Sequence, residues 1–291
     1  MSLRTDISTL KLALPTGRMK DGVIRLLADA GMPLRQDDRT YRPRISLDGV
    51  SAKMLKPQNI VEMLHAGSRD LGFAGADWVA ELDADVIEIL DTGLDPVRIV
   101  AAAPAGLLEG GGLPVRPLIV ASEYVNVTRR WIETRGMDAR VVRSFGATEV
   151  FPPEDADAIV DCTATGATLA ANRLEIVDEL MASSTRLYAN PRVLDDPPRR
   201  DAAERFALLL RSVLEARQRV MVEVNVATAR LEAVIAALPC MREPTVAALH
   251  AGAGYAVKAA VPREALAGVI PEIKARGGTD IIVSTVTQIV P

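Results

Sequence analysis

The chain has 291 residues, of which 49% are apolar, 25% are charged and 3% are aromatic, and its net charge is −4. This balance supports a folded protein of two or three domains with an aliphatic core, and it argues against disorder and against a broad basic surface for nucleic acid. No apolar run reaches the roughly 20 residues that span a bilayer, no signal-like stretch opens the chain, and the two cysteines lie far apart, so we expect a cytoplasmic protein without membrane contact.

The first hundred residues predict one lobe of a layered α/β fold, because short apolar strands alternate in them with amphipathic helices. The first strand ends at Pro15, and Gly31 gives a typical helix C-terminus. We expect strands at 10–14, 71–75, 86–90 and 97–103, and helices at 23–30 and 60–66.

A Gly- and Pro-rich stretch at 106–117 predicts a loop, after which a second lobe begins. A strand at 186–189 would then return to the first lobe. Two lobes joined in this way leave a cleft between them, and α/β proteins bind ligands beyond the carboxyl ends of their strands. In the second lobe we expect strands at 118–121, 139–142 and 158–160 and a helix at 128–135.

A break at 195–198 separates the C-terminal part, which opens with a long amphipathic helix at 199–218. The order strand, helix, strand, strand, helix, strand follows, and it is typical of a ferredoxin-like split-βαβ domain. Its strands are expected at 220–226, 245–249, 255–261 and 280–289, and its helices at 228–238 and 263–276. The predicted domains are 1–97 together with 187–215 (lobe I), 98–186 (lobe II) and 216–291 (the C-terminal domain).

The strongest local signal begins at Asp161, directly after the last strand of lobe II. A Gly-containing turn that opens a helix directs several backbone N–H groups toward one point and attracts phosphate. The hydroxyls of Thr163, Thr165 and Thr168 add donors, and Asp161 is placed to accept hydrogen bonds from sugar hydroxyls. An ordinary helix cap uses the same residue types, so the residues alone leave both interpretations open.

A second turn, Gly17 followed by Arg18, ends the first strand and offers a guanidinium that can grip phosphate or carboxylate with two hydrogen bonds. A solvated surface arginine would look the same. Taken together, a local basic stretch in an acidic chain indicates a polyanionic substrate, although each of its members alone is typical of a surface charge. This stretch consists of Arg39, Arg42, Arg44, Lys53 and Lys56.

The remaining chemistry-bearing residues give weaker signals. Glu149 lies on a predicted loop and is a base, a sugar contact or a surface carboxylate. His65 and His250 have no metal-ligand spacing around them. Nothing near Cys162 indicates the paired base of a nucleophilic thiol, and neither a Walker A sequence nor a G-x-G-x-x-G fingerprint is present.

Five segments carry motifs of one family. Residues 12–18 are similar to its opening strand and turn, 70–78 to "DLGITGxDW", 146–149 with 156–161 to "GAVE…ADAIVD", 161–172 to "D-x-x-x-TGxTLxxN", and 238–239 with 244–246 to "LPG…PTV". The fourth motif is the most specific. Over nearly its whole length the chain thus resembles ATP phosphoribosyltransferase, the first enzyme of histidine biosynthesis, in its long, regulated form.

The resemblance implies a two-lobed, periplasmic-binding-protein-like α/β catalytic body and an ACT-like regulatory βαββαβ domain. It implies a glycosyltransferase that joins N1 of ATP to C1 of phosphoribosyl pyrophosphate, releases pyrophosphate, and uses Mg²⁺ to bridge phosphate oxygens. This is the committing step of L-histidine biosynthesis. Because the sugar is cationic in the transition state, the protein has to orient the reactants and stabilise charge, and it does not need a strong nucleophile.

We therefore expect catalytic roles for Glu149 and Asp161, with Asp161 holding the ribose hydroxyls. Lobe II would carry the phosphoribosyl pyrophosphate loop. Substrate binding is expected at Gly17, Arg18, Arg39, Lys53, Asp161, Thr163, Thr165, Gly166, Ala167, Thr168 and Leu169.

The C-terminal domain is expected to bind L-histidine as an allosteric inhibitor at Pro244, Thr245 and Val246, and the protein is expected to be a homo-oligomer, a dimer or a hexamer. The motifs name neither metal ligands nor a general base. The rival interpretation is a non-catalytic bilobal binding protein that senses a phosphorylated metabolite, and release of pyrophosphate from the two substrates would distinguish the two.

Overall fold

The computed structural model describes residues 10–35 and 41–290. The chain divides into two compact units inside helix α7 (Pro197–Arg217). The first unit, which we call the body, ends at Ala207. The second, which we call the tail, begins at Leu208 and also includes 29–31. Within the described part of the chain, no helix combines the length and the apolar character needed to cross a membrane.

The body is built on one sheet of eight strands. They are β1 (Leu10–Pro15), β4 (Val50–Leu55), β5 (Leu71–Gly75), β6 (Ile87–Pro104), β7 (Leu118–Ser122), β8 (Ala139–Arg143), β9 (Ala158–Thr163) and β10 (Leu174–Ala189). Their order is β4-β1-β5-β10-β6-β9-β7-β8, and a separate pair is formed by β2 (Leu34–Arg35) and β3 (Arg44–Ile45).

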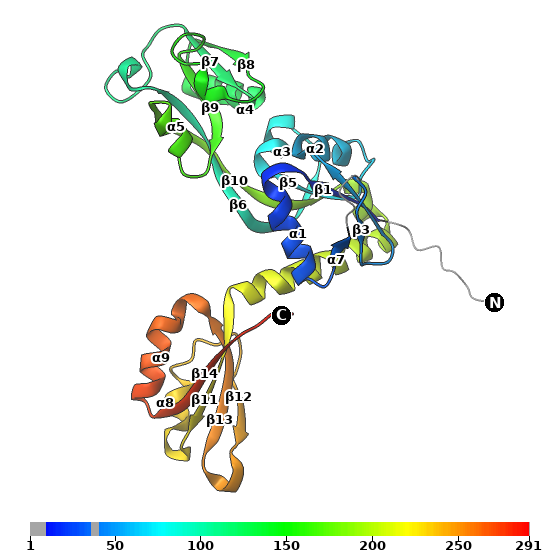
Figure 1. Ribbon diagram of the computed structural model, residues 1–291, viewed down its shortest axis with the longest axis vertical. Coiled ribbons are helices and arrows are strands. Elements are labelled where there is room, and N and C mark those ends of the chain that lie inside the picture. Colours follow the sequence, from blue (N-terminus) through cyan, green and yellow to red (C-terminus); the bar gives the residue numbers. More distant parts are fainter. Residues whose placement is uncertain (1–9, 36–40, 291) are drawn as a thin grey trace, which may run out of the picture. The chain divides into compact units, whose positions relative to one another are not determined.

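Two parallel sets of strands lie at the two ends of this sheet, and two long strands join them. β1 pairs in parallel with β4 and β5, and β7 pairs in parallel with β8 and β9. Between these sets β6 and β10 run antiparallel to each other, and β10 also pairs with β5 while β6 pairs with β9. Figure 1 shows β6 and β10 passing from one lobe to the other. The predicted two-lobed α/β body is thus confirmed.

Helices cover the two parallel sets of strands. Lobe I contains α1 (Lys20–Asp29), α2 (Pro57–His65) and α3 (Ala76–Leu82), and lobe II contains α4 (Val125–Arg135) and α5 (Ala167–Ala171). Ile60 and Leu64 of α2 are fully buried, and a Cβ at Gly72 of β5 would lie 2.6 Å from Ile60 Cγ2, so this helix packs directly on the strand. In lobe II, Trp131 and Ile132 of α4 pack against buried strand residues.

Two sequence predictions in the body were wrong in the same way. The runs 86–90 and 97–103 belong to one continuous strand, β6, although Gly93 and Asp95 inside it have positive φ. The strand expected at 186–189 is only the end of β10, which begins at Leu174. Both strands carry polar residues and register shifts that break the local pattern, and their mutual pairing keeps them extended. That pairing joins segments far apart in sequence, so no local pattern reports it.

The tail confirms the ferredoxin-like prediction. Its antiparallel strands are β11 (Arg219–Val226), β12 (Thr245–Ala248), β13 (Tyr255–Pro262) and β14 (Gly278–Thr285), in the order β12-β13-β11-β14, and its helices are α8 (Leu231–Ile235) and α9 (Leu266–Ala275). Alternate valines of β11 are buried, beginning at Val220, and they pack with Val234 of α8 and Ile273 of α9. The last strand ends at Thr285 and not at 289 as predicted.

Gly254 gives a test of the tail's packing. It has φ +123°, and a Cβ at this position would lie 2.3 Å from the carbonyl oxygen of Val226. The substitution Gly254→Ala therefore has to displace backbone, and we expect it to lower the free energy of unfolding by about 2 kcal/mol in urea denaturation. Gly252 has φ +73° but open space around it, so Gly252→Ala is the control and should cost about 1 kcal/mol. Equal losses would contradict the packing argument.

Candidate active site

A cavity of about 340 Å³ lies between the two lobes of the body. Both lobes and both long strands contribute to it, as the predicted cleft requires. Its position at the carboxyl ends of β1, β5, β7 and β9 is the place where α/β proteins bind ligands. Gly17 lines it together with the polar residues Thr16, Arg18, Gln58, Asp77, Asp95, Glu123, Tyr124, Cys162, Ser183, Ser184 and Thr185.

Asp77 is the polar centre of this cleft and is 5% exposed. Its Oδ1 accepts a hydrogen bond of 2.7 Å from Ser183 Oγ, and its Oδ2 accepts one of 2.7 Å from Tyr124 Oη. The Asp77 N–H in turn donates to Ser183 Oγ over 3.1 Å. Burial, followed by the charge of Asp77, raises the pKa of Tyr124 far above its usual range, so its phenol remains a neutral donor. Because Asp77 belongs to lobe I and Tyr124 to lobe II, this contact ties the lobes together.

Glu81 makes a second tie between the lobes. It lies on α3 of lobe I, is 6% exposed, and accepts hydrogen bonds of 2.9 Å from the backbone N–H groups of both Asn126 and Val127. These amides belong to the first turn of α4, where backbone N–H groups have no acceptor within the helix and the helix end carries a partial positive charge. The carboxylate therefore stabilises the start of a helix in the other lobe.

Asp161 lies on β9, which continues to Thr163 instead of ending at 160 as predicted, in a crowded electrostatic setting. Its pKa is raised to about 6: burial is the largest cause and the carboxylates of Glu149 and Glu123 add to it, while hydrogen bonds from the Cys162 N–H and the Thr148 side chain oppose the rise. The Cys162 N–H donates to Asp161 Oδ1 over 2.7 Å. Three carboxylates thus act on one another here, and Asp161 stays mostly ionised at neutral pH at an energetic cost.

The Thr-Gly turn follows Asp161 and holds itself in shape. Gly166 has φ +81° and its N–H donates to Thr163 Oγ1 over 2.8 Å, while the Ala167 N–H donates to Thr165 Oγ1 over 3.3 Å. Thr165, Ala167 and Thr168 are exposed, whereas Thr163 and Leu169 are buried. The cleft lining reaches this turn only through Cys162.

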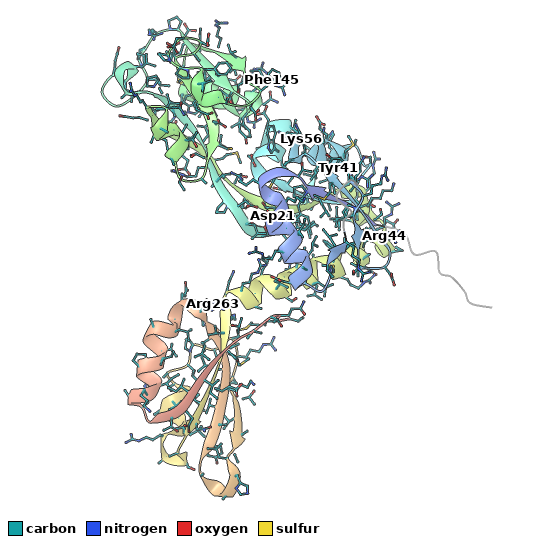
Figure 2. All side chains as sticks on the ribbon, viewed as in Figure 1. Asp21, Tyr41, Arg44, Lys56, Phe145 and Arg263 are labelled. Carbon is teal, nitrogen blue, oxygen red and sulfur yellow. The ribbon has the colours of Figure 1, made fainter. Side chains whose placement is uncertain are left out.

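The basic residues of the described segments do not converge on the cleft. Gly17 and Arg18 line it, but Lys53 is half-buried on β4 and is not in its lining, and Arg39 lies outside the described residues. Arg44 and Lys56 are well separated on lobe I (Figure 2). Of the predicted cations that the structure describes, Arg18 is therefore the one in the cavity lining.

The residues predicted for the tail lie at one side of its sheet. Thr245 lines a cavity of about 320 Å³ together with Met221, Cys240 and Lys258. Pro244 precedes β12, and Val246 on that strand is exposed; neither lines the cavity.

Sequence reasoning assigned no role at the site to Glu123, Tyr124 or Ser183. Glu123 directly follows β7, and the rule that ligands bind beyond the carboxyl ends of strands would have identified it. No local signal marks Ser183, because its role comes from a contact across 106 residues of sequence with Asp77.

The body is thus a bilobal α/β protein whose interlobe cleft adjoins a strand–turn–helix junction and a set of carboxylates. The class that this defines is a two-lobed α/β protein with a ligand cleft beyond the carboxyl ends of its strands. The model of the ATP phosphoribosyltransferase family matches residues 56–212, and that of the HisG C-terminal domain matches 216–288.

Individual relatives agree with this. The ATP phosphoribosyltransferases of Chlorobium chlorochromatii and Chlorobium phaeovibrioides are 35% and 36% identical to this chain, over 99% and 97% of it and 100% and 97% of their own lengths. A chain of the ATP phosphoribosyl transferase (HisG:HisZ) complex from Thermotoga maritima has a TM-score of 0.63 at 30% identity, covering 71% of this chain and 99% of that one. The chain belongs to the ATP phosphoribosyltransferase family.

The raised pKa of Asp161 predicts a pH-dependent stability. Its value of about 6 lies above the ordinary 3.8, so the stabilising contribution of Asp161 is complete below about pH 4 and is lost as the pH rises through 6. Asp161→Asn should therefore be more stable than the wild type above about pH 6, by roughly 1–3 kcal/mol in urea denaturation, and the difference should shrink toward about pH 4.

Asp157→Asn is the matched control with the opposite sign. Partial burial raises the pKa of Asp157, but hydrogen bonds from the Ile119 N–H and Arg116 outweigh this and lower it overall. Its contribution is therefore present at neutral pH and is lost on acidification, so the asparagine variant should be the less stable protein at neutral pH. Differences that do not change with pH in either variant would contradict this electrostatic description.

Proposed function

We propose that this protein transfers the phosphoribosyl group of phosphoribosyl pyrophosphate to N1 of ATP with release of pyrophosphate, the committing step of L-histidine biosynthesis. The observation that carries the proposal is the turn entered at Asp161. In a chain of this family it combines exposed threonines, a glycine with positive φ and an adjoining carboxylate at the edge of the interlobe cleft.

The turn would hold the sugar phosphate. Thr165, Gly166, Ala167 and Thr168 surround the first turn of α5. Threonine hydroxyls hold the Gly166 and Ala167 amides, so the Thr168 and Leu169 amides, which have no helical partners, would attract the 5′-phosphate. Thr163 supports the same function indirectly, because its buried hydroxyl fixes the Gly166 N–H. The buried Leu169 anchors the turn in the core of lobe II.

The carboxylates would stabilise the reacting sugar. As the bond from C1 to the pyrophosphate oxygen breaks, positive charge develops on the ribose, and N1 of ATP forms the new bond. Asp161 would accept hydrogen bonds from the ribose hydroxyls, and Asp161 with Glu149 would place negative charge near the cationic centre. Because these groups are fixed before the reaction, no solvent has to reorganise during it.

The leaving pyrophosphate is a polyanion, and Arg18, which lines the cleft, would bind it or the ATP phosphates. Among the described residues, no three His, Cys, Asp or Glu side chains gather to hold a metal ion. Mg²⁺ is commonly bound through substrate phosphates with few protein ligands. We propose that Mg²⁺, when bound, would neutralise charge on the substrate phosphates, and we assign it no protein ligand.

Steady-state kinetics test the assignment of the turn. Asp161→Ala and Thr165→Ala should each lower kcat/KM by at least about 100-fold, because each removes an interaction with the reacting sugar phosphate. Thr134→Ala, on the exposed face of α4, is the matched control and should retain wild-type rates. Wild-type rates in both site variants would end the assignment, and absence of pyrophosphate release by the wild type would end the proposed function itself.

For the tail we propose binding of L-histidine and inhibition of the body. The match to the family's C-terminal domain and the tail cavity beside Thr245 support this role. We also propose a homo-oligomer, because β12 and β14 are the edge strands of the tail sheet, every residue of β12 is exposed, and β14 exposes Ile282 and Val283. A cytoplasmic location agrees with the two free cysteines.

Calorimetry and inhibition assays on the full chain test the role of the tail. Thr245→Tyr fills part of the tail cavity and should weaken both the binding of L-histidine and inhibition by it at least about 10-fold, with kcat unchanged in its absence. Thr285→Tyr, at the end of the opposite edge strand, is the control and should bind as the wild type does. Inhibition that survives loss of tail binding would rule out a sensing role for the tail.

A further inference from the structure

Strand β6 is distorted where it passes the cleft. Thr185 of β10 pairs with Leu94 of β6, but the next residue of β10 pairs with Asp91. Two residues of β6 therefore bulge out at this point. Asp95 follows the bulge with φ +49°, a backbone conformation that is uncommon for residues other than glycine. Bulges and positive φ angles occur often at functional sites, where they direct a side chain, and the side chain directed here lines the cleft.

The Asp95 carboxylate is held from two sides. Its Oδ2 accepts a hydrogen bond of 2.9 Å from Oγ1 of Thr185, which is 1% exposed. A Cβ at Gly22 would lie 3.6 Å from the same oxygen, so the carboxylate also lies against the first turn of α1, where partial positive charge favours an anion. One hydroxyl uses only one of the about four acceptor sites of a carboxylate. Asp95 is therefore a fixed acceptor in the cleft with capacity left for a ligand.

Asp95 differs from the other two carboxylates of the described lining, Asp77 and Glu123. Both oxygens of Asp77 already accept the hydroxyls that join the lobes. Glu123 follows the β7 residue that pairs with Val160, so it lies beside Asp161, the carboxylate proposed for the ribose. Asp95 belongs to lobe I, and it is thus the carboxylate placed for the second substrate.

We propose that Asp95 accepts a hydrogen bond from the N6 amino group of ATP and selects adenine against a 6-oxo purine. This rests on the proposed function, because that function supplies ATP as the second substrate. The N6 amino group of adenine is a hydrogen-bond donor beside N1, whereas a 6-oxo purine has an acceptor in the same place. A carboxylate attracts the donor and repels the acceptor.

The same contact assists the reaction. N1 uses its electron pair to form the bond to C1 of the ribose, and the electron pair of the broken C1–O bond leaves on pyrophosphate. The adenine gains a positive charge, which N1 shares with the N6 amino group. A carboxylate that is fixed at this amino group before the reaction stabilises the charge as it develops. Asp95 therefore contributes to kcat as well as to the choice of base.

Calorimetry of nucleotide binding to the full chain tests the contact without turnover. The wild type should bind ATP at least about 10-fold more tightly than inosine triphosphate, because the 6-oxo group faces a carboxylate. Asp95→Asn tolerates the positive φ and keeps an oxygen for Thr185, but it turns an amide donor toward the base. The ratio of the two Kd values should therefore fall at least about 10-fold in this variant. A purely structural role would change both Kd values alike.

Two further variants keep the test specific. Asp95→Gly adopts φ +49° without strain and lacks the carboxylate, so it should fold and should also lose the preference for ATP. Asp91→Asn is the matched control, because Asp91 lies on the same strand and accepts a β10 hydroxyl, from Ser184 over 2.7 Å, but is not in the cleft lining. It should keep the wild-type ratio.

Three results would overturn the inference: a wild type without preference for ATP, an unchanged ratio in both Asp95 variants, or an equal change in Asp91→Asn. Absent pyrophosphate release by a wild type that still prefers ATP would overturn only the proposed function.

Discussion

Holding an ionised carboxylate partly out of water and beside two other carboxylates costs free energy. Asp161 of lobe II is held in this way. Burial and the charges of Glu149 and Glu123 favour the protonated form, while a backbone amide and a hydroxyl favour the ionised form. The balance leaves a pKa of about 6, near enough to neutral for the charge to be present and for its surroundings to control it. A site that stabilises a cationic sugar benefits from such a charge, because its field is weakly screened and already in place.

The same kind of bond between a buried carboxylate and fixed donors holds the lobes together. Asp77 receives a serine and a tyrosine hydroxyl, and Glu81 receives the first amides of a helix from the other lobe. The penalty for burying each charge is offset by these hydrogen bonds, which are lost if the lobes separate. Together with the two strands that both lobes share, these ties fix the width of the cleft in which the substrates would meet.

The tail is a layer of helices on a four-stranded sheet. The role proposed for it is to bind a ligand of its own, whereas the role proposed for the body is catalysis. Its valine-rich core is complete without the body, and its own cavity contains Thr245, Cys240 and Lys258. A module of this kind can bind a ligand of its own, and such binding regulates the body only if the two states of the protein bind that ligand with different affinity.

Local patterns in the chain predicted the parts of this protein that depend on neighbouring residues. The helix expected at 60–66 and found at 57–65, the strand from 71 to 75, the order of strands and helices along the tail and the Thr-Gly turn all follow from apolar periodicity and turn chemistry, which are properties of short segments. The tertiary structure alone decided that β6 and β10 are continuous, that Lys53 lies outside the cleft, and that Asp77 meets Tyr124 and Ser183 across 47 and 106 residues of sequence. Strand pairing, burial and the proton affinity of a carboxyl group depend on atoms brought together from distant segments, and no local pattern in the chain encodes those neighbours.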